Sequence, residues 1–218
     1  MGFLIRGRVA MRTLKQPRAL ETRERILSAA TRLFALKGYH DAKLEEILRT
    51  AEVTTGAFFH HFRSKEDLGF AVIDRHMEKR AELVEQIERR MPPAGEDEPL
   101  AQVFRRLDAL EGMVQQRAGR RGGCVIGNLS TSLSDTHDSF RERLAACFDS
   151  MALEFEPHLK AAARKYCPTR RVDTRGLARY IVAIIEGSIM LARTYQDRRM
   201  VRRHFDHLKD HLRKALGA

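Results

Sequence analysis

The sequence of 218 residues has no tryptophan, only six prolines and only three cysteines. It also lacks any uninterrupted apolar run of the ~18 residues needed to span a bilayer, which argues against a membrane protein. The cysteines, Cys124, Cys147 and Cys167, cannot all pair within one chain and have no metal-type spacing, so a reducing compartment is expected. The apolar patch near the N-terminus is too short for a secretory signal peptide. We therefore expect a cytoplasmic protein without membrane contact.

The chain has fewer acidic than basic residues, and the excess of basic residues is unevenly distributed along it. The chain has 40 Lys and Arg against 29 Asp and Glu, a net charge of +11. Residues 1–65 have 13 basic and 6 acidic side chains (+7), residues 66–168 have 15 and 18 (−3), and residues 169–218 have 12 and 5 (+7). A basic N-terminal region beside a mildly acidic middle favours a polyanionic partner, because Lys and Arg that meet phosphates release bound counterions.

Alternating strand patterns are absent as well, and apolar residues recur at helical spacing instead. The spacing predicts about nine helices in an all-α fold. Some boundaries are marked by breakers or caps: Gly38 ends the first helix, Ser64 is the N-cap of a helix reaching about Arg90, and Pro99 opens the next one, to about Ala118. Further helices are predicted over 124–133 and 135–166, and in "LARYIVAIIEGSIMLARTY" and "RRMVRRHFDHLKDHLRKAL".

The predicted helices divide the chain into three parts. Residues 1–17 are expected to be a flexible basic arm, with Met11 as an alternative start. Residues 18–74 form a small three-helix domain that contains a helix-turn-helix, and residues 75–218 form a larger helical bundle. The small domain is barely long enough to bury a core alone, so we expect it to dock on the larger one.

The stretch "VTTGAFFHHFRSKEDL" carries the prediction of DNA binding. Two short helices joined by "TAEV" satisfy the helix-turn-helix pattern, whose second helix enters the major groove. Phe58 and Phe62 lie four residues apart and can pack on the first helix of the domain, whereas small residues at the helix start allow close approach to DNA. The predicted DNA contacts are Arg49, Thr54, Thr55, Gly56, Phe59, His60, His61 and Lys65. The alternatives are a packing unit without nucleic acid and, for His60, a solvated helix end.

The segment from "RILSAATRLFALKGYHDAKLEEILRT" to "AEVTTGAFFHHFRSKEDL" resembles the DNA-binding domain of TetR-family transcriptional regulators. The resemblance covers about the first third of the chain through the patterns "LF..KGY", "I...A.V" and "HHF.SKE.L". The all-helical remainder is similar in layout to the ligand-binding and dimerisation domain of that family. The resemblance implies a homodimer that binds a palindromic operator in double-stranded DNA and releases it when a small-molecule effector binds.

Several positions depart from the pattern of that family. Ala42 replaces a threonine that caps the second helix, with Asp41 as the candidate replacement, and Glu52 replaces the turn glycine. Thr55 stands for a common lysine, and Phe59 for a tyrosine whose hydroxyl contacts phosphate. These changes predict an uncommon operator sequence. Basic side chains of the arm could offset the lost contacts: Arg6, Arg8, Arg12, Lys15 and Arg18.

The stretch "GRRGGCVIGNLSTSLSD" predicts a sensing site. Cys124 lies at a helix N-terminus just after Arg120 and Arg121, and both features favour a reactive thiolate. The stretch also resembles the "GC..GN" signature of a TetR subgroup that includes regulators of reactive-electrophile and acrylate-type responses, although Ser132 stands where that signature has an acidic residue. The alternative is a small buried cysteine, with Asn128 and its neighbouring glycines serving close packing.

An effector pocket is predicted between the helices of the larger domain. Its expected lining is apolar with few polar groups, as small-molecule sites require: Phe104, Leu107, Met113, Thr131, Phe148, Met151 and Met190, together with Cys124, Asn128 and Glu186. The alternative for these residues is ordinary core. Glu186 could orient a ligand or form a salt bridge to Arg179 or Arg193, and Gly187 inside a helix is best explained by close approach at a dimer interface.

His204, His207 and His211 share one face of the last helix, which invites a metal interpretation. Without a nearby cysteine or acidic pair, a solvated or dimer-edge face explains them better, and neither metal nor cofactor is expected. The sequence also has no catalytic triad order and no phosphate loop. The predicted function is a repressor released by a small molecule or by modification of a cysteine. The alternatives are a constitutive DNA-binding protein without effector and an enzyme that binds a small molecule.

Overall fold

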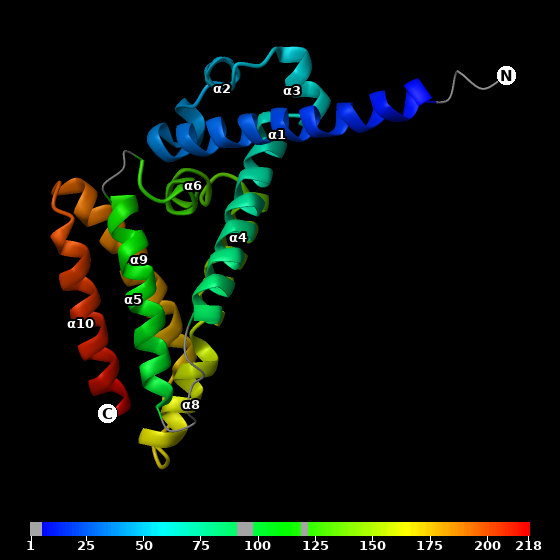
Figure 1. Cartoon of the computed structure of the whole chain (residues 1–218). Coiled ribbons are helices and arrows are strands. Elements are labelled where there is room, and N and C mark those ends of the chain that lie inside the picture. The colour runs from blue at the N-terminus through cyan, green and yellow to red at the C-terminus, as the bar shows by residue number, and fades with distance from the viewer. Residues whose placement is uncertain (1–5, 91–97, 119–121) are drawn as a thin grey trace.

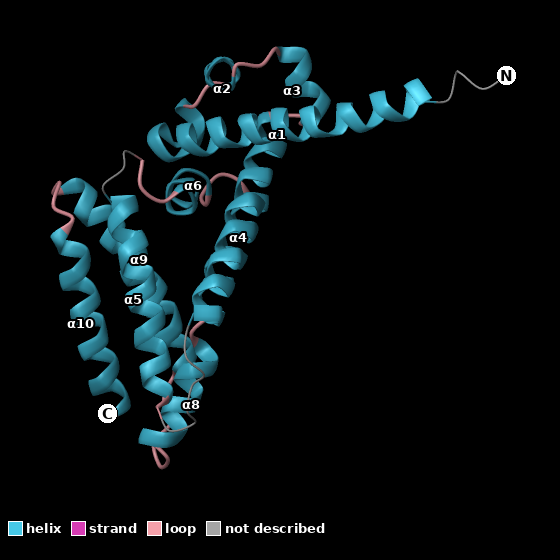
Figure 2. Cartoon of the chain, in the orientation of Figure 1, coloured by secondary structure: helices cyan, strands magenta, loops and turns pink. Residues whose placement is uncertain are grey.

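The computed structural model describes residues 6–90, 98–118 and 122–218. Within these ranges the chain forms ten helices and no strand, which confirms the all-α prediction (Figure 2). The helices are α1 (Arg6–Asp41), α2 (Leu44–Ala51), α3 (Thr55–His61), α4 (Lys65–Arg90), α5 (Pro99–Ala118), α6 (Val125–Leu133), α7 (Asp138–Leu153), α8 (Glu156–Tyr166), α9 (Thr174–Thr194) and α10 (Arg199–Leu216). None of the described helices is long and apolar enough to cross a membrane.

Helices α1, α2 and α3 pack around one apolar core at the top of the molecule (Figure 1). Ile26 and Phe34 of α1, Ile47 of α2 and Phe58 of α3 are completely buried. The two α1 residues are eight positions apart, so they share one helix face and can both turn toward the short helices. This small core holds α2 and α3 in a fixed mutual orientation.

The remaining long helices form the larger bundle. Helix α9 packs against α5, α7, α8 and α10, and the core of this bundle includes the fully buried Leu107, Phe155, Ile181 and Phe205. Helix α4 runs from the three-helix unit down toward the bundle (Figure 1). The domain boundary within α4 near residue 74 stays a prediction.

Helix α6 follows the bundle helix α5 in sequence but packs against α1 (Figure 1). Ile126, Leu129 and Leu133 are fully buried, so one face of this short helix is entirely apolar. A hydrogen bond from the backbone N–H of Asn128 to the carbonyl of Cys124 closes its first turn at 3.0 Å. Because α6 contacts both α1 and the bundle, we call it the joint helix.

The N-terminal region differs from the sequence prediction. Residues 6–17, expected as part of a flexible arm, have a helical backbone that continues into α1. Gly38 interrupts the helix as predicted, since its backbone is non-helical with φ 78° and ψ 177°, but a second short helical stretch follows it to Asp41. Residues 1–5 and the side chains of the predicted arm residues Arg6, Arg8, Arg12 and Lys15 lie outside the described part of the structure.

The prediction of one helix from Asp135 to Tyr166 is wrong. The chain turns before Asp138, where α7 begins, and α7 ends at Leu153. Helix α8 then starts at Glu156 with a proline in its first turn. Pro157 has no N–H and would clash inside a continuous helix, but it is tolerated at a helix start. The break explains why ten helices are described where about nine were predicted.

Candidate DNA interface and effector site

Arg25 of α1 holds the turn between α2 and α3 through hydrogen bonds to its backbone. Its Nε and Nη2 donate hydrogen bonds to the carbonyl of Ala51 at 2.9 and 2.6 Å, and Nη2 also donates to the carbonyl of Glu52 at 2.6 Å. These charge-assisted bonds satisfy carbonyls at the C-terminus of α2, where no intrahelical partner is available. Arg25 therefore fixes the angle at which α3 leaves the turn.

Both ends of α2 depart from the common capping chemistry. Lys43 occupies the N-cap position and makes no side-chain cap hydrogen bond, so the expectation that Asp41 replaces the capping threonine at Ala42 is wrong. At the other end Glu52 adopts the left-handed conformation, with φ 53° and ψ 48°. A glycine reaches this region without steric cost, whereas a side chain there costs roughly 1 kcal/mol. The turn nevertheless forms, because the backbone hydrogen bonds at the end of α2 do not depend on the side chain at position 52.

The start of α3 presents small, exposed residues. Thr54 is the N-cap, and its Oγ1 accepts a hydrogen bond from the N–H of Ala57 at 3.2 Å. Thr54, Thr55 and Gly56 are exposed, and a Cβ added to Gly56 would meet no protein atom within 4 Å. The fold therefore does not require glycine at position 56. A small residue here leaves room for a molecule that approaches the helix from outside.

The aromatic residues of α3 divide between core and surface. Phe58 is 0% exposed and Phe62 is 3% exposed, and their ring centroids are 5.7 Å apart, in agreement with the predicted core packing. Phe59 is 56% exposed although its ring centroid lies only 5.2 Å from that of Phe58. An exposed phenylalanine beside a buried one offers an apolar contact surface on the same side as the exposed helix start.

The basic residues predicted to contact DNA have different surroundings. Arg49, in the last turn of α2, and His60 are exposed, while His61 is half-buried. Burial, the neighbouring His60 and then the charge of Arg23 lower the pKa of His61 below its ordinary value of 6.5. In the free protein His61 therefore takes up a proton less readily than an unburied histidine, and its ring can form a hydrogen bond to a phosphate.

Lys65 is used within the protein in this structure. Its Nζ lies 4.5 Å from the centroid of the Tyr39 ring and donates a hydrogen bond to the carbonyl of His40 at 3.4 Å. Burial lowers the pKa of Lys65. The cap of α4 is made by Ser64, as predicted, whose Oγ accepts from the N–H of Asp67 at 3.0 Å. To bind a phosphate, Lys65 would have to leave the Tyr39 ring.

A cleft of about 170 Å³ between α6 and α9 brings together several of the predicted effector residues. Its lining includes Cys124, Asn128, Thr131, Glu186 and Met190. A Cβ added to Gly127 would lie 2.7 Å from a carboxylate oxygen of Glu186, so the glycine allows this carboxylate to approach α6. We call this space the α6–α9 cleft.

Cys124 is the N-cap of α6 and is only 5% exposed. Arg120 and Arg121, predicted to activate its thiol, lie outside the described residues. The cation that lines the cleft is Arg193 of α9, whose Nη1 donates to the carbonyl of Gly122 at 2.6 Å. By contrast, burial raises the pKa of Cys147 to about 11, so that thiol stays protonated at neutral pH.

Asn128 connects the joint helix to α1. Its Nδ2 donates to the carbonyl of Ala35 and, at 2.7 Å, to the carbonyl of Gly122, so both amide hydrogens are used within the protein. Gly122 has φ 105°, and a Cβ there would come within 2.9 Å of the backbone of Ala35. The glycine is thus required by both conformation and space. These contacts give Asn128 a positioning role between α1 and α6.

The remaining predicted lining residues do not join the α6–α9 cleft. Leu107 and Met151 are buried in the core, Met113 packs against it, and Phe104 lies 4.7 Å below the guanidinium of Arg213. Phe148 lines a separate apolar groove of about 440 Å³ between α7 and α9. That all these residues line one pocket therefore stays a prediction, since Leu107 and Met151 are enclosed by the core while Phe148 lies at the groove.

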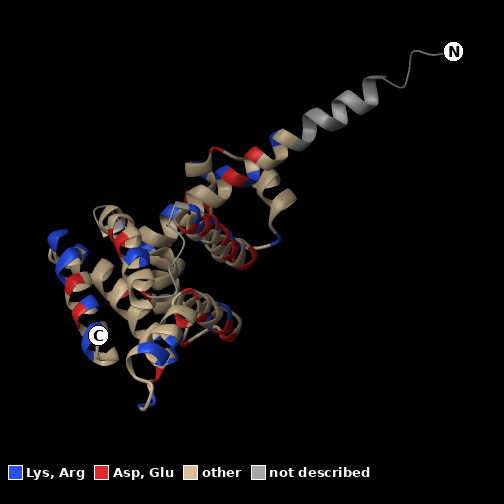
Figure 3. Ribbon diagram, turned by 60° about the horizontal axis from the view of Figure 1, so that its bottom comes forward, with Lys and Arg blue, Asp and Glu red and all other residues tan. Residues whose placement is uncertain are grey.

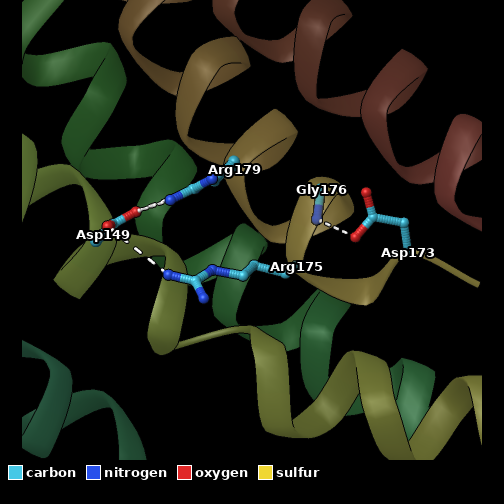
Figure 4. Close-up of polar contacts among 5 residues, drawn as sticks. All are labelled: Asp149, Asp173, Arg175, Gly176 and Arg179. Atoms are coloured by element: carbon cyan, nitrogen blue, oxygen red, sulfur yellow. Dashed lines mark hydrogen bonds and ion pairs between the residues drawn. The ribbon is translucent and has the colours of Figure 1, made fainter.

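Glu186 borders both the cleft and the α7–α9 groove. Arg179, one of its two predicted partners, instead forms an ion pair with Asp149 at 2.7 Å across that groove (Figure 4). Arg175 lies 3.9 Å from the same carboxylate, and Asp173 caps α9 by accepting from the N–H of Gly176 at 2.8 Å. The mouth of the groove is therefore charged although its walls are apolar.

Two of the three histidines of α10 contact α9, and the third, His207, is exposed. Nδ1 of His204 lies 3.1 Å from Oγ of Ser188, and the ring of His211 lies 4.9 Å from that of Tyr180. Among the described residues, no group of three or more His, Cys, Asp or Glu could hold a metal ion.

Sequence reasoning did not identify Arg25 as a residue that positions the turn, nor the bond of Arg193 to Gly122. Each joins residues far apart in the chain, 26 and 71 positions respectively, and one sequence carries no signal for such pairs.

Comparison with known proteins agrees with this geometry. Residues 26–72 match the family described as bacterial regulatory proteins, tetR family, and residues 99–208 match the tetracyclin repressor-like C-terminal domain. An uncharacterized HTH-type transcriptional regulator in the lacX 3'region of Lactococcus lactis subsp. lactis is 30% identical over 89% of this chain and 94% of its own length. The HTH-type transcriptional repressor DhaR of Mycobacterium sp. (strain GP1) is 26% identical over 81% of this chain and 84% of its own. A TetR transcriptional regulator from Chloroflexus aurantiacus superposes with a TM-score of 0.74 at 28% identity, covering 90% and 96% of the two chains.

Proposed function

The chain belongs to the TetR family of bacterial transcriptional regulators, and from this premise we propose that it is a homodimeric repressor released from a palindromic operator by an effector. The relatives reported above are transcriptional regulators, and this chain is a DNA-binding regulator rather than an enzyme. The observation that carries the proposal is the open start of α3, where a Cβ at Gly56 meets no protein atom within 4 Å. The similarity to the repressor DhaR supports repression rather than activation.

DNA recognition assigns different roles to the two sides of α3. Phe58 and Phe62 hold the helix on the core, and Thr54, Thr55 and Gly56 meet base edges and phosphates at its N-terminal end. Arg49 and His60 lie exposed near the backbone of the duplex. In a two-fold dimer, the two α3 helices bind half-sites separated by one turn of DNA, roughly 34 Å.

An exposed apolar face on α9 is the proposed dimer interface. Tyr180 is 39% exposed and Met190 is 58% exposed, and Gly187 lies between them with no atom within 4 Å of an added Cβ. These positions follow helical spacing, and a helix glycine costs roughly 1 kcal/mol relative to alanine unless it serves close packing. A partner helix packed over Gly187 explains both the exposed aromatic residue and the glycine.

The α6–α9 cleft is the proposed sensing site, with Cys124 as its reactive group. An electrophile such as N-ethylmaleimide would form a bond between Sγ and a ring carbon, and the thiol proton would end on the neighbouring carbon. Because Cys124 is only 5% exposed, an adduct on its Sγ presses on the packed side chains that line the cleft, and α6 moves away from α9. The small cleft favours this covalent trigger over a large reversible ligand.

Movement of α6 reaches the DNA-binding helices through Asn128. Its bond to Ala35 ties α6 to α1, and α1 carries Arg25, which sets the turn before α3. A displaced α6 therefore changes the orientation of α1 and the spacing of the two recognition helices. Effector and operator then bind different arrangements of one dimer, which is the requirement for allosteric release.

A gel-shift titration with the DNA upstream of its own gene, with and without N-ethylmaleimide, tests the proposal. We expect the untreated dimer to bind and the treated dimer to lose affinity. Cys124→Ser should stay bound after treatment, whereas Cys167→Ser, whose cysteine lies in the bundle beside Leu216, should still be released. Release of Cys124→Ser by the reagent would rule out the thiol trigger.

The same titration separates the competing functions. A dimer that binds this DNA and ignores both electrophiles and small molecules would be a constitutive DNA-binding protein. A dimer that binds no DNA at low ionic strength would contradict the proposed role of α3.

A further inference from the structure

A further cavity, of about 520 Å³, is lined by residues of α1, of α4 and of the start of α6. It shares Gly123 and Cys124 with the α6–α9 cleft, and its other walls are the middle of α1 and the middle of α4. It therefore lies at the junction of the three-helix unit with the rest of the protein. We call it the junction cavity.

The walls of the junction cavity carry positive charge and no negative charge. Arg32 of α1 and Arg75 and Lys79 of α4 line it, and its lining includes neither aspartate nor glutamate. Hydroxyl groups of Ser28 and Thr31 complete the α1 wall. Like charges that face one space repel each other, and an anion within that space removes the repulsion.

The three cations differ in what balances them. Arg75 lies 2.8 Å from Glu24 and donates a hydrogen bond to Oγ of Ser28 at 2.9 Å, which ties α4 to α1. Among the residues that the structure describes, Arg32 and Lys79 have no carboxylate at ion-pair distance, and both are exposed. Two cations without a counter-charge thus face the cavity beside one that is paired.

We propose that the junction cavity binds a small organic oxyanion, that is, a carboxylate or a phosphate ester. Its volume falls within the range of roughly 300–1,000 Å³ typical of small-molecule sites. Arg32 from the α1 wall and Lys79 from the α4 wall contact the oxyanion, and guanidinium and ammonium groups are suited to carboxylate and phosphate oxygens. The site adjoins the proposed sensing site, since Cys124 lines both spaces, but it binds its ligand through cations rather than through the thiol.

Occupancy of the junction cavity changes the tie between α1 and α4. A bound oxyanion attracts Arg75 in competition with Glu24 and Ser28, so the ion pair that fixes α1 on α4 weakens. Because α1 carries the helix-turn-helix, the recognition helices shift relative to each other and DNA affinity falls. This effect on DNA rests on the proposed function, whereas the binding of an oxyanion does not.

The two minimal oxyanions, inorganic phosphate and acetate, are the probes for the experiment. Each is titrated into the full-length protein at constant ionic strength while backbone amide resonances are followed by NMR. We expect saturable shifts concentrated in α1, α4 and the start of α6, and the tighter of the two probes identifies the class of ligand. Shifts that do not saturate, or that avoid these three helices, would overturn the site.

Two double variants with the same change of charge provide the decisive control. Arg32→Gln with Lys79→Gln should weaken binding of the tighter probe about tenfold or more and leaves the Arg75 pair intact. Arg202→Gln with Arg203→Gln removes two exposed cations from the first turns of α10, which are basic in Figure 3, and should change the affinity less than about twofold. Equal losses in both variants would show attraction by net charge and overturn the proposal.

A DNA titration at saturating probe concentration tests the regulatory step. The wild-type protein should lose affinity for its upstream DNA, and the variant with Arg32 and Lys79 replaced should not respond. If the probe binds in the junction cavity and DNA affinity stays unchanged, the regulatory step is wrong and the site stands. If the protein binds no DNA at all, the proposed function fails, and the NMR titration still decides the site.

Discussion

The recognition helix α3 and the joint helix α6 are both short helices, and their polar groups are used in opposite ways. In α3, Thr55 and Gly56 face solvent, and the glycine has open space around it. At α6, the amide of Asn128 bonds to two carbonyls, and Gly122 has backbone of Ala35 where a side chain would be. The polar groups of α3 are therefore available to an external partner, whereas those of α6 are bonded within the protein.

This difference predicts that α3 acts in DNA binding, whereas α6 connects the effector region to α1. Substitutions on the open side of α3 should change DNA affinity with little loss of stability, because no protein contact is removed. Substitutions around α6 should cost stability and also change the connection between the effector region and α1.

Gly122→Ala should destabilise the protein by roughly 2–4 kcal/mol. The new Cβ adds a side chain at φ 105° and lies 2.9 Å from the backbone of Ala35, so strain and overlap add together. Urea unfolding monitored by circular dichroism measures the loss. Gly112→Ala in α5, where an added Cβ meets nothing within 4 Å, is the control and should be neutral or stabilising. Equal stability of the two variants would show that glycine is not required at position 122, where the chain packs against α1.

Asn128→Ala should cost about 1–3 kcal/mol, since the carbonyl of Ala35 loses its side-chain donor. Hydrogen exchange should increase at the contact of α1 with α6, and N-ethylmaleimide should release DNA less completely. Thr131→Ala removes a hydroxyl that bonds only within α6, to the carbonyl of Gly127, and should stay within about 0.5 kcal/mol of wild type. An Asn128→Ala protein with normal release would show that the signal takes another route.

Gly56→Ala should separate stability from DNA binding. Alanine is the better helix former, so unfolding should require about 0.5–1 kcal/mol more. The added methyl projects from the open start of α3 and should weaken binding to the upstream DNA about tenfold. Denaturation and gel-shift titration of the same preparation measure both changes. Unchanged DNA affinity would mean that this side of α3 does not approach the duplex closely.

His61→Gln should reduce the dependence of stability on pH. The folded state lowers the pKa of His61 below 6.5, mainly through burial, so the folded protein takes up its proton less readily than the unfolded chain. The stability associated with neutral His61 is complete above pH 6.5 and declines as pH falls through the folded pKa. Urea midpoints at about pH 7.5 and about pH 5.5 should therefore differ less in the variant. His207→Gln on the exposed face of α10 is the matched control. An equal effect of this substitution would show that the dependence of stability on pH does not come from His61.

The helix-turn-helix could be predicted closely because its signals are local. Burial of Phe58 and Phe62 follows from their spacing, and the caps at Thr54 and Ser64 follow from side chains that reach their own first turns. The break before Pro157 also has a local cause, because proline cannot continue a helix, and the predicted helix over 135–166 did not take it into account. Local rules thus account for most element boundaries.

The effector region could be predicted only in part. Cys124, Asn128, Glu186 and Met190 do meet in one cleft, but Phe148 lies in another space. Helical spacing shows that a residue points inward and does not show which neighbouring helix it meets. The bonds that give Asn128 its role reach a residue 93 positions away. Such contacts are decided by packing of the whole chain.

The helical character of this chain, its helix-turn-helix and its basic N-terminal region all follow from the order of residues, because periodicity, caps and charge are properties of neighbouring residues. The packing of α6 on α1, the bonds of Arg25 to the turn before α3 and the cavity lined by cations of α1 and α4 appear only once the chain is folded. Each of these depends on how distant helices pack, since contact energies act between neighbours in space wherever the residues lie in the chain.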